Sequence, residues 1–156
     1  MEDSENNNTK GEHYSQEKVD LKDDSDEIES KKKTERIVEL YYKCFERQES
    51  EIVDCNEIDG YTISTPEFPG GINSFRQRVA QFIDYGEFEG KGLLQTMISF
   101  IVEPDGTMSN ISAKGDNIQF NNEGVNALKS IKAKWVPARL AGVYVRFKMR
   151  LPLGVF

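Results

Sequence analysis

The chain has 156 residues, a formal net charge of −7 and a single histidine. This length is sufficient for one modest domain with its own core and leaves little chain for a second. The sequence has neither a run of 18 apolar residues nor a cationic leader followed by an apolar segment. It therefore predicts no membrane span and no export signal.

The negative charge is concentrated in the first part of the chain. Residues 1–65 carry 9 Lys/Arg and 19 Asp/Glu, whereas residues 66–156 carry 11 and 8 together with all five prolines. This break predicts a boundary near residue 66. Residues 1–30 contain no Phe or Trp and cannot offset an ordering cost of roughly 1–2 kcal/mol per residue. We expect a disordered acidic tail there, acting as a solvated tether or as an acidic interaction segment.

Residues 31–65 are expected to form an amphipathic helix followed by an extended connector. Thr34 is a candidate cap, and the apolar face that follows has helical spacing: Ile37, Leu40, Tyr41, Cys44 and Phe45. Such a helix either packs on the domain that follows or forms a surface for a partner. Cys44 and Cys55 match no zinc or redox spacing. They are either two unrelated thiols or, in an oxidising compartment, a disulfide closed when residues 59–65 fold back.

The segment Phe68-Pro69-Gly70-Gly71 is expected to lead into a second helix. Pro69 disfavours a helical conformation at Phe68, and the two glycines permit a turn that side chains would obstruct. Asn73 is the candidate cap. The expected apolar face consists of Phe75, Val79, Phe82 and Ile83.

A hairpin is predicted next. Residues 94–102 are predicted to form a strand with one buried side, made up of Leu94, Thr96, Ile98, Phe100 and Val102. Pro104-Asp105-Gly106 supplies a turn through the fixed φ of proline, the Asp105 carboxylate and the freedom of Gly106. Residues 108–114 form the returning strand.

A third helix and a final strand complete the pattern. The helix has the apolar face Phe120, Gly124, Ala127, Leu128 and Ile131. Lysines near its end suit the helix dipole and solubility, so no nucleic-acid site is expected. Trp135 is expected to anchor the core edge, with stacking on a ligand as the alternative, and Pro137 prevents the helix from continuing.

The final strand is predicted over Val143–Leu151, after a turn at Ala141-Gly142. Its inward side chains are Val143, Val145, Phe147, Met149 and Leu151, and its outward ones are Tyr144, Arg146, Lys148 and Arg150. Three outward cations either protect an exposed sheet edge or provide a landing strip for an extended acidic or polar peptide.

No catalytic set can be assembled from this sequence. The only histidine, His13, lies in the expected tail, so no catalytic triad is predicted. Glu87 and Glu89 lie beside glycines, a pattern that indicates a solvated loop and not a catalytic carboxylate pair. We therefore expect a protein that is not an enzyme, with no metal and no cofactor.

Residues 66–156 resemble the C-terminal domain of TonB energy transducers, in the form found among small Bacteroidetes-type envelope proteins. The resemblance is carried by Pro-Glu-Phe-Pro-Gly-Gly at 66–71, Gly92, Phe100-x-Val102-Glu103-x-Asp105-Gly106, Asn110-Ile111, Lys134-Trp135-x-Pro137, Val145-Arg146 and Leu151-Pro152. It implies an α+β fold ordered helix, strand, strand, helix, strand, with a small antiparallel sheet backed by two helices. The extra N-terminal helix and the tail would precede it.

The resemblance also implies a function. In that family the domain transmits force from a proton-motive inner-membrane complex to outer-membrane transporters, by pairing its last strand with a short extended segment called the TonB box. The implied partner-binding residues are Tyr144, Val145, Arg146, Phe147, Lys148, Met149 and Arg150. The implied compartment is the periplasm, although a chain complete as given would be expected in the cytoplasm. The alternative is a structural or assembly protein that forms homodimers through its last strand or through the 37–45 helix face.

Overall fold

A computed structural model describes residues 26–155 of the chain. Most of the expected acidic tail, residues 1–25, lies outside the described residues. Within the described residues, the N-terminal helix spans residues 26–47 and thus begins before residue 31, where a helix was expected to start. Glu27 and Glu29 precede Lys31 and Lys33 by four residues each, a spacing that favours an earlier helix start. Thr34 lies inside this helix and is not its cap.

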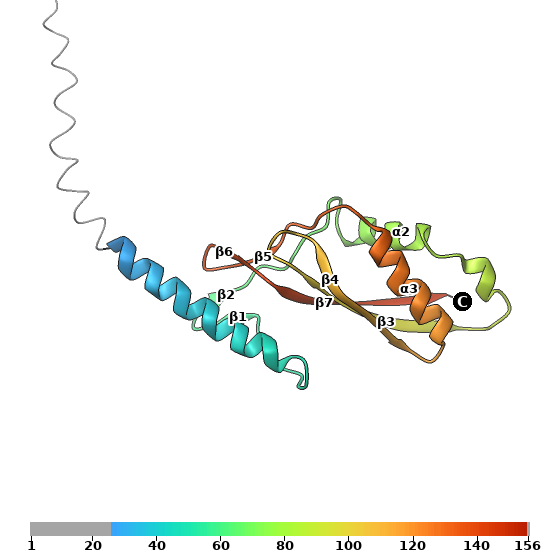
Figure 1. The fold of residues 1–156 in the computed structure, drawn as a ribbon, viewed down its shortest axis with the longest axis horizontal. Coiled ribbons are helices and arrows are strands. Elements are labelled where there is room, and N and C mark those ends of the chain that lie inside the picture. Colours follow the sequence, from blue (N-terminus) through green and yellow to red (C-terminus); the bar gives the residue numbers. More distant parts are fainter. Residues whose placement is uncertain (1–25, 156) are drawn as a thin grey trace, which may run out of the picture.

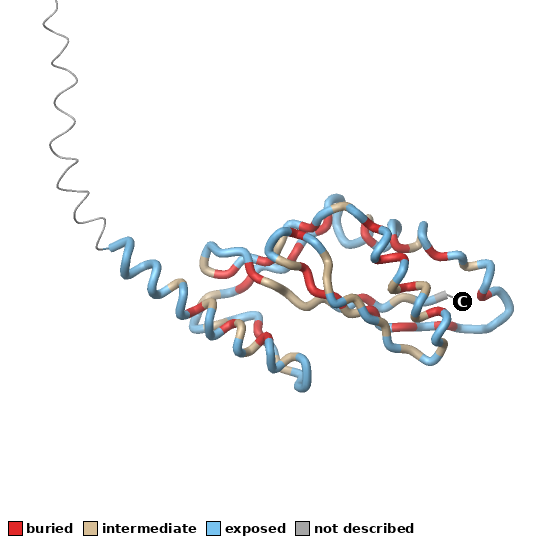
Figure 2. Tube along the Cα trace, in the orientation of Figure 1, coloured by how far each residue is buried: buried red, intermediate tan, exposed pale blue. Residues whose placement is uncertain are grey.

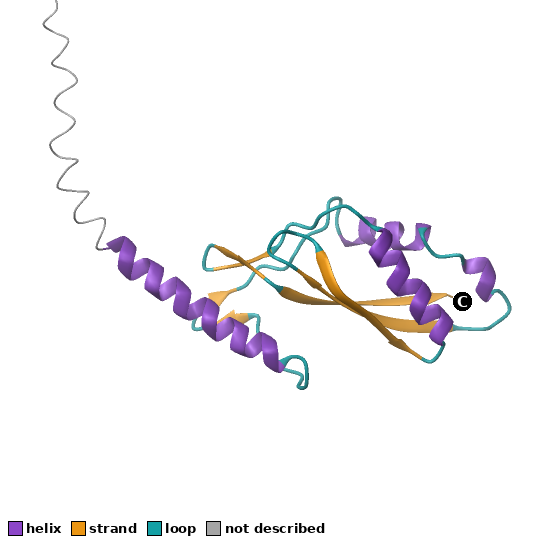
Figure 3. Cartoon of the chain, in the orientation of Figure 1, coloured by secondary structure: helices purple, strands orange, loops and turns teal. Residues whose placement is uncertain are grey.

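The fold is α+β, with antiparallel strand pairs (Figures 1 and 3). The other helices are α2 (Ile72–Gln81), the short 3-10 helix η1 (Tyr85–Phe88) and α3 (Ile118–Ser130). The strands are β1 (Glu57–Ile58), β2 (Tyr61–Thr62), β3 (Leu94–Val102), β4 (Met108–Gly115), β5 (Ala138–Leu140), β6 (Val143–Val145) and β7 (Phe147–Val155). The main sheet has the order β4-β3-β7, while β1-β2 and β5-β6 are hairpins. No helix among residues 26–155 is long and apolar enough to cross a membrane.

The helices α2 and α3 cover one face of the main sheet (Figure 1). Alternation in β3 buries Ile98, Phe100 and Val102 on this face, as predicted. Trp135 lies in the same cluster, with its ring centroid 4.8 Å from that of Phe75. The main core is therefore a layer of helices on a sheet.

The N-terminal helix packs at the end of the sheet where β3 finishes and β7 begins. Ile37, Tyr41 and Phe45 are buried against a second cluster that includes Ile101, which points to the face opposite α2 and α3. Leu40 remains 41% exposed. Figure 2 shows that the first turns of this helix are exposed. The helix face thus packs on the following domain.

A disulfide joins Cys44 in this helix to Cys55 in the loop that follows, with the two Cα atoms 5.9 Å apart. Cys55 is buried in the second cluster. Cys44 and Cys55 were expected to be either two unrelated thiols or a disulfide, and in the structure they form the disulfide.

Two expectations near α2 are wrong. The residue before α2 is Gly71, which makes no side-chain capping bond, and Asn73 lies inside the helix. Gly70 and Gly71 both have positive φ, 87° and 93°, so the glycine turn itself sets the helix start. Phe82 follows the last helical residue and is 46% exposed, whereas Ile83 after it is buried in the main core.

The predicted strand over 143–151 is also wrong as a single element. It is divided at Arg146 into β6, which pairs with β5, and β7, which pairs with β3. Val143 is consequently exposed at the tip of the β5-β6 hairpin instead of facing inward.

Candidate partner-binding edge

Strand β7 is an edge strand of the main sheet. It pairs with β3 over its full length, from Phe147 opposite Val102 to Val155 opposite Leu94. Within the described residues, no strand pairs with its other side. An unpaired side presents backbone N–H and C=O groups that a further strand can use.

The position of Pro152 shows which residues of β7 direct their backbone groups to the unpaired side of the strand. Pro152 stands opposite Met97 and has no N–H, so this pair belongs to the non-hydrogen-bonded type of an antiparallel ladder. Because the two types alternate, Lys148, Arg150 and Gly154 also direct their backbone groups away from β3. We call these four residues, 148, 150, 152 and 154, the free edge of β7.

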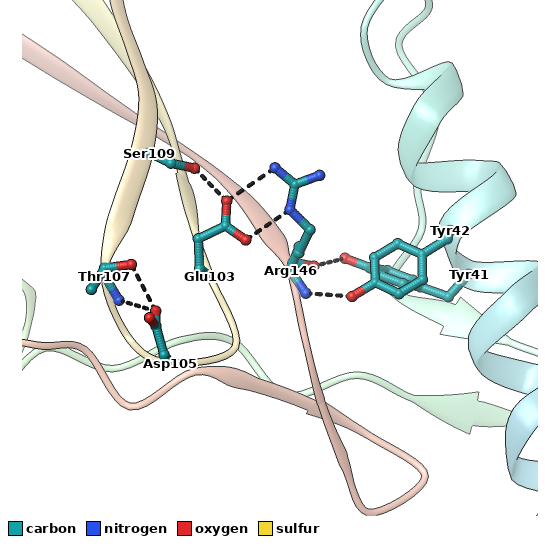
Figure 4. Close-up of polar contacts among 7 residues, drawn as sticks. All are labelled: Tyr41, Tyr42, Glu103, Asp105, Thr107, Ser109 and Arg146. Atoms are coloured by element: carbon teal, nitrogen blue, oxygen red, sulfur yellow. Dashed lines mark hydrogen bonds and ion pairs between the residues drawn. The ribbon is translucent and has the colours of Figure 1, made fainter.

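Arg146 continues the same alternation, but its backbone groups are already bonded (Figure 4). The Tyr41 hydroxyl donates to its carbonyl at 2.6 Å, and its N–H donates to the Tyr42 hydroxyl oxygen at 2.9 Å. Burial raises the pKa of Tyr41, so its hydroxyl stays protonated and able to donate. The N-terminal helix thereby closes the upstream end of the free edge.

The Arg146 side chain makes a two-pronged ion pair with Glu103 (Figure 4). Its Nε donates to one carboxylate oxygen at 2.8 Å and its Nη2 to the other at 3.0 Å. Ser109 also donates a hydrogen bond to Glu103. The bonds from Arg146 hold the pKa of Glu103 below its usual value, and Glu103 raises the pKa of Arg146. This pair fixes the junction between β6 and β7.

The predicted site residues are thus divided among different roles. Tyr144 and Val145 belong to β6, where Tyr144 lies under Arg139 and Val145 is fully buried. Phe147 and Met149 pack against the two clusters. Of the seven residues, only Lys148 and Arg150 contribute to the free edge.

The residues predicted to be structural surround the core and its turns. Phe68 and Trp135 are buried together, with ring centroids 5.2 Å apart. The Asp105 carboxylate accepts from the N–H and hydroxyl of Thr107, which lowers its pKa. Gly106 has φ 88° and lies so close to the Trp135 carbonyl that a Cβ would collide with it. Of the remaining predicted residues, Pro69, Gly70 and Gly71 form the turn before α2 and Pro137 directly precedes β5.

Three residues of the site were not predicted, namely Tyr41, Tyr42 and Glu103. Tyr41 and Tyr42 are separated from Arg146 by 105 and 104 positions, so their hydrogen bonds to its backbone could not be predicted from sequence spacing. Tyr41 on the predicted apolar face was the one visible hint, because buried tyrosine hydroxyls usually find a partner.

Among residues 26–155, no group of three or more His, Cys, Asp or Glu side chains is placed to hold a metal ion. The chain matches no protein-family model, no curated protein and no solved structure.

Proposed function

We propose that this protein is a peptide-binding module similar to the TonB C-terminal domain, which pairs its β7 edge with an extended segment of an outer-membrane transporter. The observation that carries the proposal is the free edge of β7, with Lys148 and Arg150 beside its outward backbone groups. Main-chain hydrogen bonds would supply affinity, and the two cations would favour acidic or polar segments.

Two further features support this proposal. The elements α2, β3, β4, α3 and β7 follow the order helix, strand, strand, helix, strand. The Cys44–Cys55 disulfide suits an oxidising compartment such as the periplasm.

Charge favours a different chain over a second copy as the partner. If two copies paired antiparallel through β7, Lys148 and Arg150 of one copy would stand near the same cations of the other. Like charges on facing strands are destabilising. In addition, Ile37, Tyr41 and Phe45 are buried within the chain and cannot form a dimer surface while the helix is docked.

The test is backbone NMR of the full chain, titrated with a synthetic peptide spanning the plug N-terminus of a candidate transporter. Two derivatives of the peptide carry N-methyl groups on alternate residues, in the two complementary patterns. Only one pattern removes the donors that face β7, so one derivative should lose binding and the other should keep it. Shifts are expected at the amides of Lys148, Arg150 and Gly154.

The variant Lys148→Pro provides the matching change on the protein. The Lys148 N–H points away from β3, so the variant should keep its fold and bind the peptide about tenfold more weakly. No shift at millimolar peptide, or equal binding of both methylated derivatives, would refute strand pairing. A concentration-dependent dimer that disappears in Lys148→Pro would instead assign the edge to self-assembly.

A further inference from the structure

The sheet face opposite α2 and α3, here called the open face, has a polar hollow of about 290 Å³ next to the end of the N-terminal helix. Its lining comes from three strands and the turn after this helix. The side chains with polar groups in the lining are Gln48, Glu49, Ser99, Asn110, Ser112, Lys148 and Arg150. The hollow adjoins the free edge because Lys148 and Arg150 belong to both.

A bulge in the sheet shapes one wall of this hollow. The β3-β4 register shifts between Ser99 and Ile101, so that Phe100 stands opposite two residues, Asn110 and Ile111. Asn110 has a φ of 49°, in the left-handed region of backbone conformation that residues other than glycine rarely adopt. Bulges re-aim side chains and are frequent beside binding sites. Asn110, which belongs to this bulge, is one of the residues that line the hollow.

The charge balance of the hollow is positive. The Lys148 side chain is only 16% exposed, with its ammonium 3.8 Å from the Glu49 carboxylate and 5.7 Å from the Phe45 ring centroid. Arg150 is exposed and forms no ion pair with any residue from 26 to 155. Two cations thus face one carboxylate, which leaves a surplus positive charge.

We infer that this hollow binds the carboxylate of an aspartate or glutamate side chain carried by the segment that pairs with β7. The inference rests on the proposed function and names the residue type that the edge selects. A strand added to β7 would place alternate side chains on the open face, next to those of Lys148 and Arg150. The two cations supply the charge, and the side chains of Ser99, Asn110 and Ser112 supply hydrogen-bond donors.

The test compares two end-capped ten-residue peptides with alternating threonine and valine, one with a central glutamate and one with glutamine at that position. Both are titrated into the labelled full chain, and binding is followed at the β7 amides. The glutamate peptide should bind about fivefold more tightly. This preference should fall to less than about twofold in Arg150→Gln, since the variant removes the cation that forms no ion pair among residues 26–155.

Two further variants separate the hollow from general charge effects. Asn110→Gly keeps a residue that accepts positive φ but deletes the amide, and it should reduce the preference for glutamate. Lys91→Gln removes a cation from an exposed loop away from the hollow and should leave the preference unchanged.

The outcomes separate the two proposals. Equal binding of both peptides at β7, or a glutamate preference that survives in Arg150→Gln, overturns the carboxylate site and leaves strand pairing intact. Failure of both peptides to shift the β7 amides, together with failure of the transporter peptide, overturns strand pairing and the carboxylate site with it.

Discussion

At the scale of single residues, Glu103 joins two parts of the sheet, because its carboxylate accepts hydrogen bonds from Arg146 beside β7 and from Ser109 in β4. Its side chain is 22% exposed, so solvent screens the ion pair only in part. Bonds of this kind contribute more than those of exposed ion pairs.

We predict that Glu103→Gln lowers the free energy of unfolding by about 1 kcal/mol at pH 7. The folded-state pKa of Glu103 is depressed. Its stabilising effect is therefore fully present above the unfolded-state pKa of about 4.3 and is lost as the pH falls through the lower folded-state value. Urea denaturation should show a difference between variant and parent at pH 7 that shrinks towards pH 3.

The control is Glu89→Gln, which makes the same change at an exposed loop position. It should leave stability nearly unchanged. A destabilisation by Glu103→Gln of equal size at both pH values would contradict the role assigned to the ionised carboxylate.

At the scale of elements, the N-terminal helix is docked through the two tyrosine hydroxyls on the backbone of Arg146. These contacts differ in direction, since Tyr42 accepts from the N–H whereas Tyr41 donates to the carbonyl. The two tyrosines can therefore be distinguished by the amide proton of Arg146.

We predict that Tyr42→Phe accelerates hydrogen exchange at the Arg146 amide, because it removes the acceptor of that N–H. Each of Tyr41→Phe and Tyr42→Phe should cost about 1 kcal/mol of unfolding free energy, but Tyr41→Phe should leave the local exchange rate close to that of the parent. Exchange measured by NMR on the labelled chain distinguishes them. Equal acceleration by both variants would show that the whole helix end opens instead.

At the scale of the whole molecule, the two core clusters share strand β3. Phe100 and Val102 lie in the cluster under α2 and α3, while Ile101 between them lies in the cluster under the N-terminal helix. Because β3 contributes side chains to both clusters, loss of packing in one cluster should destabilise the other, and the two should unfold together.

We predict that Ile37→Ala shifts the unfolding transition reported by Trp135 fluorescence, although Ile37 and Trp135 lie in different clusters. The expected loss is about 2–5 kcal/mol for a buried isoleucine. Trp135 is the only tryptophan, so its signal reports on the larger cluster alone. An unchanged tryptophan transition, with a separate earlier change in far-UV circular dichroism, would mean that the helix unfolds independently.

The sequence predicted the helices and strands in which buried side chains recur at one regular spacing along the whole element. Leu94–Val102 is a strand with the predicted bounds, and the apolar positions of α3 are buried as expected. Division of the last strand at Arg146 was missed because the alternation of side chains continues through it. The division arises from a change of pairing partner, from β5 to β3, and sequence spacing does not encode such a long-range choice.

The candidate site was predictable only in its central part. Lys148 and Arg150 were recognised from alternation, since both lie on the face of β7 away from the main core. The closure of the edge at Arg146 depends on contacts between residues more than 100 positions apart. Glu103 was noted only as part of a motif of the family resemblance, and its ion pair with Arg146 could be found only once the fold was known.

If the free edge pairs with an acidic segment as proposed, the two cations beside it would make this pairing depend on ionic strength. Salt screens the attraction between Lys148, Arg150 and an acidic segment, and it equally screens the repulsion between the edges of two copies. Added salt would therefore weaken the proposed pairing with an acidic segment and would reduce the repulsion that disfavours pairing of two copies. At low salt β7 would thus favour an acidic segment of another chain, and at high salt the disadvantage of a second copy as its partner would be smaller.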